Sequence, residues 1–358
     1  MPEAALVPVG AARREAVLAR LCGLALSTPA TSFTQDELLP LLGLSADPFA
    51  ETIFARSGVR KRHLELSPGT LATTLQARTE ATEEQLVRLA LDATDQLDFE
   101  PEEIGLVVTA TYYSLGGPTL AHRLVDELGL EPRTDKYHLV GVGCASAVPL
   151  FRLAARCLRD HPGCKALVVA AESVSGFLTP VSPGDGKAKV VGSALFGDGC
   201  AASLLGGPGE DAGGPVILAT AVHQVAGTLG HVRFGVTGED SHMRISRELP
   251  AVAEEGARPL VEAFLHEHGL SPADVNHWLV HPGGPGIIEA VQRGLGLADE
   301  QVAPSFRVLS EFGNVGTPAS LFVLAETVEE RRPAPGDTGL MITIGPGVTV
   351  GLMLLAWR

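Results

Sequence analysis

Paired cysteine spacing, a surplus of basic residues and a long apolar run are all missing from this sequence. Its five cysteines are odd in number and include no CxxC pair, which argues against a disulfide framework and against a zinc site. Lysine and arginine total 27 against 42 aspartate and glutamate residues, and a net charge of −15 disfavours a nucleic-acid partner, because phosphate backbones are bound by clustered cations. No stretch reaches the roughly 20 apolar residues of a membrane helix, and no targeting segment is recognisable at the start. We therefore expect a cytoplasmic protein with reduced thiols and no membrane contact.

What the sequence does contain is enough apolar material for a large core. Its 358 residues are 45% hydrophobic and 19% charged, which predicts one big domain or two fused halves.

Apolar strands and amphipathic helices alternate along most of the chain. After a strand within 16–30 and short helices at 34–44 and 47–58, the first half is expected to follow the order 82–97 helix, 104–111 strand, 119–130 helix, 137–143 strand, 145–158 helix and 166–172 strand. Thr82 and Gln85 have the spacing of a capping box at the start of the first of these helices. The second half is expected to contain helices at 250–269, 284–297 and 317–331 and strands at 277–281, 339–345 and 348–357.

This alternation predicts an α/β fold with mostly parallel or mixed sheets that helices cover on both faces. The similar order of elements in the two halves suggests a duplication of a βαβαβαββ unit into five layers (αβαβα), although the halves share negligible sequence identity. A Gly- and Pro-rich joint at 204–216 divides the chain into 1–210, which carries the candidate cysteine, and 211–358.

Cys144 stands between small residues in "VGVGCASAVPL", where a strand is predicted to end and a helix to begin. The unpaired N–H groups and dipole of a helix N-terminus favour an anion, so we expect the pKa of this thiol to fall, more so beside a histidine. A cysteine without partners is an ordinary packing residue, so a nucleophile needs other groups nearby.

Two polar residues are candidates for those partners. His281 ends an apolar strand just before "PGGPG", where glycines leave the imidazole facing an open crevice; alternatively it caps the next helix or bonds buried backbone. Asn314 lies between glycines in "EFGNVGTP", and its amide can donate to an oxygen; alternatively it is a left-handed turn residue. The turn "TIGPGVTVG" frees N–H groups at Gly345 and Gly347 that would line an oxyanion site with the Cys144 amide, unless it is simply a tight hairpin turn.

One basic cluster interrupts the acidic sequence, in "ARSGVRKRHLE". Its members Arg56, Arg60, Lys61 and Arg62 are candidates to hold the phosphates of an anionic cofactor or substrate. The alternative is a solvated turn that leads into a strand.

Taken together, these segments resemble the type III polyketide synthases, the chalcone and stilbene synthase-like family of the thiolase superfamily. The resemblance covers about residues 15–357 and rests on five segments in the same order, "GVGCASA", "SALFGDGCAASLL", "HPGGPGIIEAV", "EFGNVGTPASLFVL" and "GPGVTVGLMLL". It implies the thiolase-like five-layered fold and a homodimer. It also implies that the basic cluster is the region that holds the phosphates of coenzyme A (CoA).

The resemblance assigns a role to each polar candidate. Cys144 would carry the acyl chain, while His281 and Asn314 would handle the malonyl unit. An acyl-CoA starter would load onto Cys144, and malonyl-CoA-type extenders would add by repeated decarboxylative Claisen condensation until cyclisation or release. CoA thioesters are the expected substrates, and no metal or redox cofactor is needed. Phe196 would sit between the acyl tunnel and the cavity.

Several positions depart from the plant members of the family. Met243 stands where they have a second gatekeeping phenylalanine, Tyr112 and Tyr113 stand where they have small hydroxyl residues, and Gly316 replaces a serine near the catalytic centre. We therefore expect a bacterial-type enzyme that does not form chalcone and whose bulky tyrosines restrict starter size or chain length.

Two other functions remain open at this point. A ketoacyl carrier-protein synthase of the initiating type shares the fold and the Cys, His and Asn logic, but usually has an asparagine shortly after the histidine, where this chain has Gly283 and Gly284. A catalytically idle homologue in a biosynthetic complex is the other, although all three polar residues are present.

Overall fold

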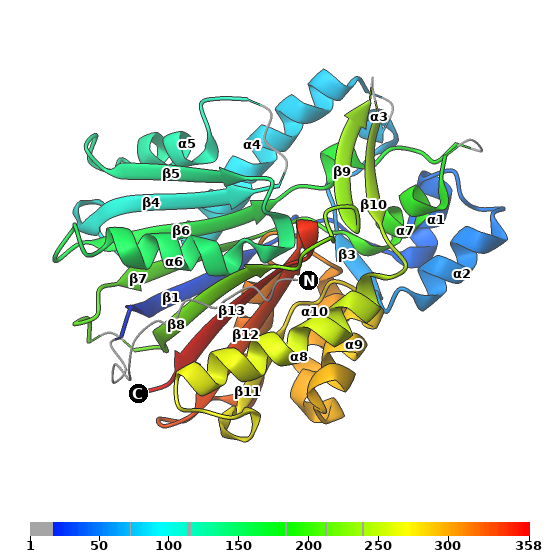
Figure 1. Ribbon diagram of the computed structural model, residues 1–358. Coiled ribbons are helices and arrows are strands. Elements are labelled where there is room, and N and C mark those ends of the chain that lie inside the picture. Colours follow the sequence, from blue (N-terminus) through cyan, green and yellow to red (C-terminus); the bar gives the residue numbers. More distant parts are fainter. Residues whose placement is uncertain (1–16, 72, 113–115, 183–184, 212, 238–239) are drawn as a thin grey trace.

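The computed structural model describes residues 17–71, 73–112, 116–182, 185–211, 213–237 and 240–358 (Figure 1). Its central sheet is built from nine strands. These are β1 (Ala19–Ser27), β4 (Ile104–Thr111), β5 (Asp135–Val140), β6 (Lys165–Glu172), β7 (Gly199–Gly206), β8 (Val216–Gln224), β11 (His277–Val280), β12 (Thr338–Gly345) and β13 (Thr349–Ala356). Their order across the sheet is β11-β12-β13-β8-β1-β7-β6-β4-β5.

Helices and two small two-stranded sheets surround this sheet. The helices are α1 (Gln35–Leu41), α2 (Pro48–Arg56), α3 (Pro68–Leu71), α4 (Leu75–Thr94), α5 (Leu120–Glu127), α6 (Ala147–Cys157), α7 (Lys187–Leu195), α8 (Leu249–Glu267), α9 (Pro285–Leu295), α10 (Asp299–Phe312) and α11 (Ala319–Arg331). The small sheets pair β2 (Ser32–Thr34) with β3 (Lys61–His63), and β9 (Val232–Thr237) with β10 (Asp240–Ile245). No helix among these residues is both long and apolar enough to span a membrane.

The strand pairing of the first half recurs in the second. The series β1-β7-β6-β4 is joined by antiparallel, antiparallel and parallel ladders, and the series β8-β13-β12-β11 follows the same sequence of directions. The strands of the two halves, called here the first sheet and the second sheet, are joined where β1 pairs with β8 over two residue pairs, Ala19 with Ile217 and Arg20 with Val216. The duplication inferred from element order is therefore present in the sheet itself.

The second half departs from the expected βαβαβαββ order at one place. The first half continues from β4 to a parallel strand, β5, whereas residues 296–318 contain no strand and instead form α10, which contacts α9, α11 and β11. The sequence analysis did not predict this helix. Its inward residues Val302, Ser305, Val308 and Leu309 have helical spacing, but Pro304 interrupts the pattern.

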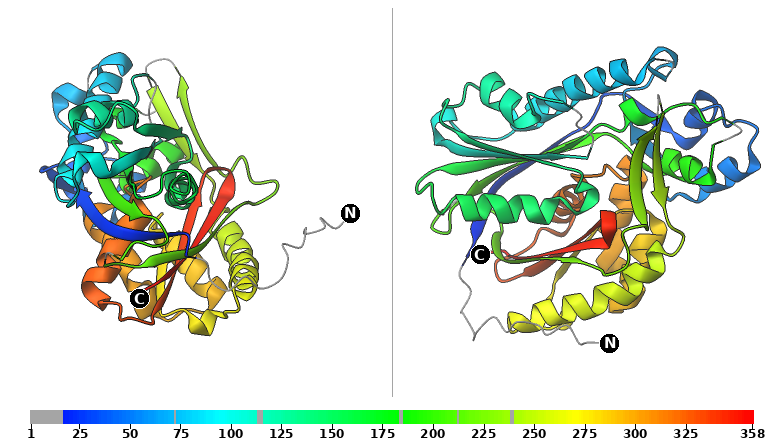
Figure 2. Two further views of the ribbon diagram at one scale, coloured as in Figure 1. Left: turned by 90° about the vertical axis from the view of Figure 1, so that its left-hand side faces the viewer. Right: turned by 45° about the horizontal axis from the view of Figure 1, so that its top comes forward.

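Side-chain alternation along the strands produces the five layers. Leu106, Val108 and Ala110 of β4 face the middle layer of α6 and α11, while Val107 faces α4 and α5. In the second sheet Met341 turns toward the same middle layer and the neighbouring strand positions turn toward α8 and α9. The αβαβα layering is thus confirmed, and Figure 2 shows the helices on both outer faces and between the sheets.

The start of α4 differs from the prediction. The helix begins at Leu75, and the hydroxyl of Thr74 accepts a hydrogen bond from the Ala77 N–H. Thr82 and Gln85 are buried in mid-helix, so the capping box predicted there is wrong. The segment before Thr82 consists mostly of good helix formers, which extends the helix by two turns. β7 ends and β8 begins within the predicted joint at 204–216, and the boundary at 210 stays a prediction.

Candidate active site

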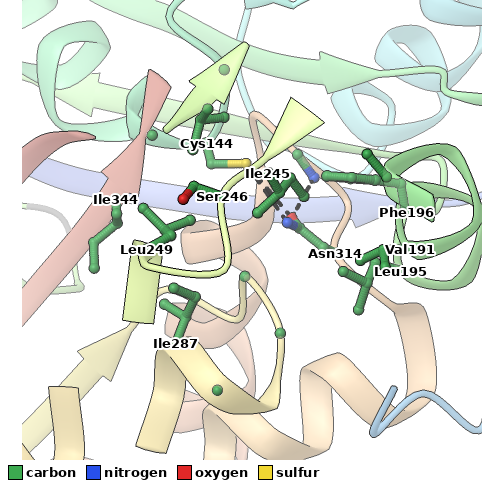
Figure 3. A pocket seen from close by; sticks show the side chains of 18 of the residues that line it. Cys144, Val191, Leu195, Phe196, Ile245, Ser246, Leu249, Ile287, Asn314 and Ile344 are labelled. Carbon is green, nitrogen blue, oxygen red and sulfur yellow. Dashed lines mark hydrogen bonds between the residues drawn. The ribbon is translucent and has the colours of Figure 1, made fainter. Parts of the chain in front are cut away.

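A cavity of about 570 Å³ lies where the parallel strands of both halves end. Cys144 follows β5, Glu172 ends β6, His281 follows β11 and Gly345 ends β12, and all four line the cavity. Asn314, two residues after α10, lines it as well. Residues from distant parts of the sequence therefore meet at the carboxyl edges of the two sheets, the usual location of ligand sites in α/β folds. Figure 3 shows Cys144 and Asn314 pointing toward one another across this cavity.

The turn that carries Cys144 is built on glycines. β5 ends at Val140, Gly141 and Gly143 have positive φ angles of 80° and 58°, and a 3₁₀ turn over Gly143–Ala145 precedes α6. Gly345 is needed beneath this turn, because a Cβ there would lie 2.6 Å from the Ala145 nitrogen. The end of β12 therefore packs directly against the turn that carries Cys144 and fixes the position of its thiol in the cavity wall.

Asn314 is fixed by both its backbone and its side chain. Its N–H donates to the Leu195 carbonyl (2.9 Å), and its Oδ1 accepts the Gly316 N–H (2.9 Å). The amide nitrogen Nδ2 lies 3.7 Å from Sγ of Cys144. Oδ1 lies 3.8 Å from the same sulfur and can accept the thiol proton as well as the Gly316 N–H, because an amide oxygen has two lone pairs. Nδ2 has hydrogens to donate to the sulfur or to a ligand bound there.

His281 is held in place by backbone contacts at the end of β11. Its N–H donates to the Ile342 carbonyl (2.9 Å), and only 3% of the residue is exposed. A Cβ at Gly283 would lie 2.9 Å from Nε2 of the imidazole, so a side chain at this position would collide with the ring. Nδ1 is buried and has no hydrogen-bond partner among the described residues. The ring is therefore available to a ligand in the cavity.

Burial decides the protonation states of these groups. It raises the pKa of the Cys144 thiol to about 12, and the hydrogen bond from Asn314 opposes this only partly. It also lowers the pKa of the His281 imidazole to about 3. The expected fall in the pKa of Cys144 is therefore wrong: the thiol lies in the 3₁₀ turn rather than in the first turn of α6, and desolvation disfavours its charge. At neutral pH the thiol and the imidazole are therefore both uncharged.

Glu172 is a site residue that the sequence analysis missed. Its side chain is 1% exposed, and it accepts hydrogen bonds from the Thr317 hydroxyl (2.6 Å), the Thr111 hydroxyl (3.1 Å) and the Tyr112 N–H (3.1 Å). Burial raises its pKa to about 7. The signal that could have indicated this residue is a carboxylate at the end of the otherwise apolar strand "ALVVAAE".

Phe196 and Tyr112 both line the cavity, and their roles toward substrate stay predictions. Phe196 caps α7 and lines the cavity, and Tyr112 places its ring next to Gly143, where a Cβ would lie 3.1 Å from Cδ2 of the tyrosine. Gly316 also lines the cavity and touches Glu172, since a Cβ there would lie 2.9 Å from the Cγ of the glutamate. Tyr113 and the side chain of Met243 lie outside the described residues.

The two glycines of the turn after β12 differ in their position relative to the cavity. Gly345 lines the cavity, whereas Gly347 is not among the described lining residues and instead faces Gln224 and Leu229. An oxyanion role for either N–H stays a prediction.

The basic cluster divides into three environments. Arg62 is fully buried and donates to the Phe196 carbonyl and to Gln35, so its predicted contact with CoA phosphates is wrong. Arg60 and Lys61 both pair with Glu311, while Arg56 is exposed at the end of α2. Roles for Arg56, Arg60 and Lys61 stay predictions.

Comparison with known protein families agrees with this geometry. Residues 31–228 match the FAE1/type III polyketide synthase-like family, and residues 217–357 match the C-terminal domain of the chalcone and stilbene synthases. The chain belongs to the type III polyketide synthase family. It is therefore an acyltransferase-type enzyme, a polyketide synthase, and the predicted resemblance is confirmed.

Individual relatives place the chain among bacterial members. It is 35% identical over 78% of its length to the alpha-pyrone synthesis polyketide synthase-like Pks18 of Mycobacterium tuberculosis, of which the alignment covers 73%. It is 30% identical over 94% of its length to the 3,5-dihydroxyphenylacetyl-CoA synthase of Streptomyces toyocaensis, of which 90% is covered. The crystal structure of PKS-I from the brown alga Ectocarpus siliculosus superposes with a TM-score of 0.88 at 27% identity, covering 96% of this chain and all of that one. The thiolase-like fold is thus confirmed. These matches favour a polyketide synthase over an initiating ketoacyl synthase.

Proposed function

We propose that this enzyme loads an acyl group from a CoA thioester onto Cys144 and extends it by repeated decarboxylative Claisen condensation with a malonyl-CoA-type extender, followed by cyclisation or release. The observation that carries this proposal is the convergence of Cys144, His281 and Asn314 in one cavity, with the Asn314 amide 3.7 Å from the thiol.

Loading requires a base, because the thiol is protonated at neutral pH. The neutral imidazole of His281 accepts the Cys144 proton as Sγ attacks the thioester carbonyl. The Sγ–C bond forms, the bond from carbon to the CoA sulfur breaks, and the proton passes from His281 to the departing CoA thiolate. His281 is then neutral again, ready for the next step.

Extension uses the same groups as hydrogen-bond donors. The Asn314 NH₂ and the ring N–H of His281 donate to the thioester carbonyl of the malonyl unit, and this stabilises the enolate left when carbon dioxide departs. The enolate carbon attacks the acyl carbonyl on Cys144, so that a C–C bond forms and the bond to Sγ breaks. The lengthened chain can return to Cys144 for another round. The scheme uses no metal and no redox cofactor.

The cavity wall favours an aliphatic starter. Val191, Leu195 and Phe196 line one side, and Leu249, Ile287 and Ile344 line the other (Figure 3). Ile245 also lines the cavity. Burying an alkyl chain against this surface releases about 0.8 kcal/mol for each CH₂ group.

The proposal also includes a homodimer and a cytoplasmic location. An edge strand, β5, exposes Tyr137 (42%) and Val140 (48%), which supports a homodimer. All five cysteines are free thiols, which supports a reducing cytoplasm.

Mass spectrometry tests this function directly. The wild-type protein and Cys144→Ala are incubated with malonyl-CoA and a panel of acyl-CoA starters, and both protein adducts and small products are followed. We expect an acyl group on Cys144 and products with more than one malonate-derived unit, both lost in Cys144→Ala. Products with one such unit, formed only from carrier-protein substrates, would contradict iterative extension from CoA thioesters.

A further inference from the structure

Two chain segments, 195–197 at the end of α7 and 312–314 at the end of α10, pass each other beside the cavity and are called here the crossing. The Asn314 N–H donates to the Leu195 carbonyl (2.9 Å), and the Gly197 N–H donates to the Asn314 carbonyl (3.1 Å). The two segments thereby form a parallel bridge outside the main sheets. The position of the Asn314 side chain therefore depends on how this crossing is held.

Arg62, in β3, packs against the crossing. Its Nη1 donates to the Phe196 carbonyl (2.8 Å) and its Nη2 to Oε1 of Gln35 (3.1 Å). Nε2 of Gln35 in turn donates to the Ala194 carbonyl (2.8 Å). A Cβ at Gly313 would lie 3.0 Å from both Cγ and Cδ of Arg62. The guanidinium group therefore holds one segment of the crossing by hydrogen bonds, while the aliphatic part of the same side chain packs on the other segment.

The guanidinium of Arg62 is buried and charged. Burial lowers its pKa to about 9, and the charge of Asp198 opposes this fall, so the group is charged at neutral pH. A hydrogen bond from a charged donor is shorter and stronger than one between neutral groups. An apolar side chain of similar length would fill the same space, so what the guanidinium adds is a directed, charge-assisted bond to the Phe196 carbonyl.

We infer that Arg62 is a positioning residue, which holds the crossing in place and thereby keeps the Asn314 amide beside Cys144. The inference rests on the proposed function, in which Asn314 donates to the malonyl thioester carbonyl. Arg62 is absent from the described residues that line the cavity, so it acts through Asn314 and not on the substrate. Stabilisation of a developing enolate depends on the exact placement of the donor, so a small shift of the crossing should slow decarboxylation.

A double-mutant cycle on malonyl-CoA decarboxylation tests this coupling. In the Cys144→Ala background, Arg62→Met should lower kcat by about 10- to 100-fold with an unchanged KM, because the donor shifts while the cavity stays in place. The same change should have no further effect once Asn314→Ala is present, because the group through which Arg62 acts is then missing. Arg62→Lys, which keeps a donor for the Phe196 carbonyl, should recover part of the lost rate.

The matched control is Arg78→Met, which removes another buried arginine. Arg78, in α4, donates to the main-chain carbonyls of Gly176 (3.0 Å) and Thr73 (2.6 Å), outside the crossing. We expect this variant to decarboxylate malonyl-CoA as the Cys144→Ala background does, whatever the change in its Tm. Equal losses of rate in Arg62→Met and Arg78→Met would indicate a general destabilisation and would overturn the inference.

Hydrogen exchange followed by mass spectrometry tests the crossing without turnover. Arg62→Met, or Arg62→Lys if the first variant does not fold, should exchange faster than the wild type in the peptides that carry the Gly197 and Asn314 N–H groups, and at the wild-type rate elsewhere. Unchanged exchange in these peptides, or faster exchange throughout the chain, would count against the inference.

The kinetic cycle has two contrary outcomes of its own. One is an unchanged decarboxylation rate in Arg62→Met, and the other is a loss of rate that is as large without Asn314 as with it. Failure of the proposed function would look different: no form of the protein would decarboxylate malonyl-CoA, yet exchange at the crossing would still respond to Arg62→Met.

Discussion

Nδ2 of Asn314 lies 3.7 Å from Sγ of Cys144, and this orientation is set by a third group, the N–H of Gly316, which bonds Oδ1 at 2.9 Å. Sγ also lies 3.8 Å from Oδ1, so both the donor and the acceptor of the amide are within reach of the reacting centre. Because the donor is fixed before substrate arrives, little reorganisation is needed when negative charge develops beside it.

Replacement of Asn314 should separate the two halves of the reaction. In a Cys144→Ala background, which keeps His281 and Asn314, we expect malonyl-CoA to lose carbon dioxide without condensation. Adding Asn314→Ala should lower this decarboxylation rate by about 10²- to 10³-fold, the usual effect of removing one oxyanion donor. Release of acetyl-CoA, followed by chromatography, measures the rate. An unchanged rate would show that Asn314 does not stabilise the enolate.

Alkylation of Cys144 should report a protonated thiol. Since burial raises its pKa to about 12, the rate of reaction with iodoacetamide should rise about tenfold for each pH unit between 7 and 9 and reach no plateau in this range. Peptide-resolved mass spectrometry distinguishes Cys144 from the other four cysteines. A rate that levels off near pH 6 would instead indicate a thiolate stabilised by the helix end.

Glu172 should make the stability of the fold depend on pH. Its pKa is raised from 4.5 to about 7, so between these values the folded protein binds more protons than the unfolded chain, and the stability falls as the pH rises. The loss from this group is complete above pH 7 and amounts to roughly 3 kcal/mol. Thermal unfolding of the wild type and Glu172→Gln from pH 4.5 to 8 measures it. The wild-type Tm should fall relative to that of the variant, and parallel curves would contradict the prediction.

Tyr112 should limit the space beside the nucleophile. Its ring packs against Gly143, next to Cys144, so Tyr112→Thr should open the cavity and shift the products toward longer chains or bulkier starters. Tyr112→Phe keeps the volume and serves as the control, with an unchanged product spectrum. Liquid chromatography with mass detection compares the spectra for each starter. Identical spectra for wild type and Tyr112→Thr would mean that Tyr112 does not limit the product.

The order of strand and helix patterns along the sequence is enough to predict most of the fold, because hydrophobic periodicity is a local property. The prediction from these patterns is wrong at two places, where one local sequence signal opposes another. Pro304 concealed α10, and Thr82 with Gln85 suggested a helix start inside a helix that begins at Leu75.

Local sequence patterns were sufficient to predict the layering and to select Cys144, His281 and Asn314 as candidates, since each of the three lies beside glycines at the end of a strand or helix. The protonation states and contacts of the site residues follow from the three-dimensional packing alone. Burial raises the pKa of Cys144, packing leaves Arg62 with no exposed surface, and the fold places Glu172 in the cavity wall. Burial and charge environment depend on residues far apart in the chain, so no local pattern encodes them.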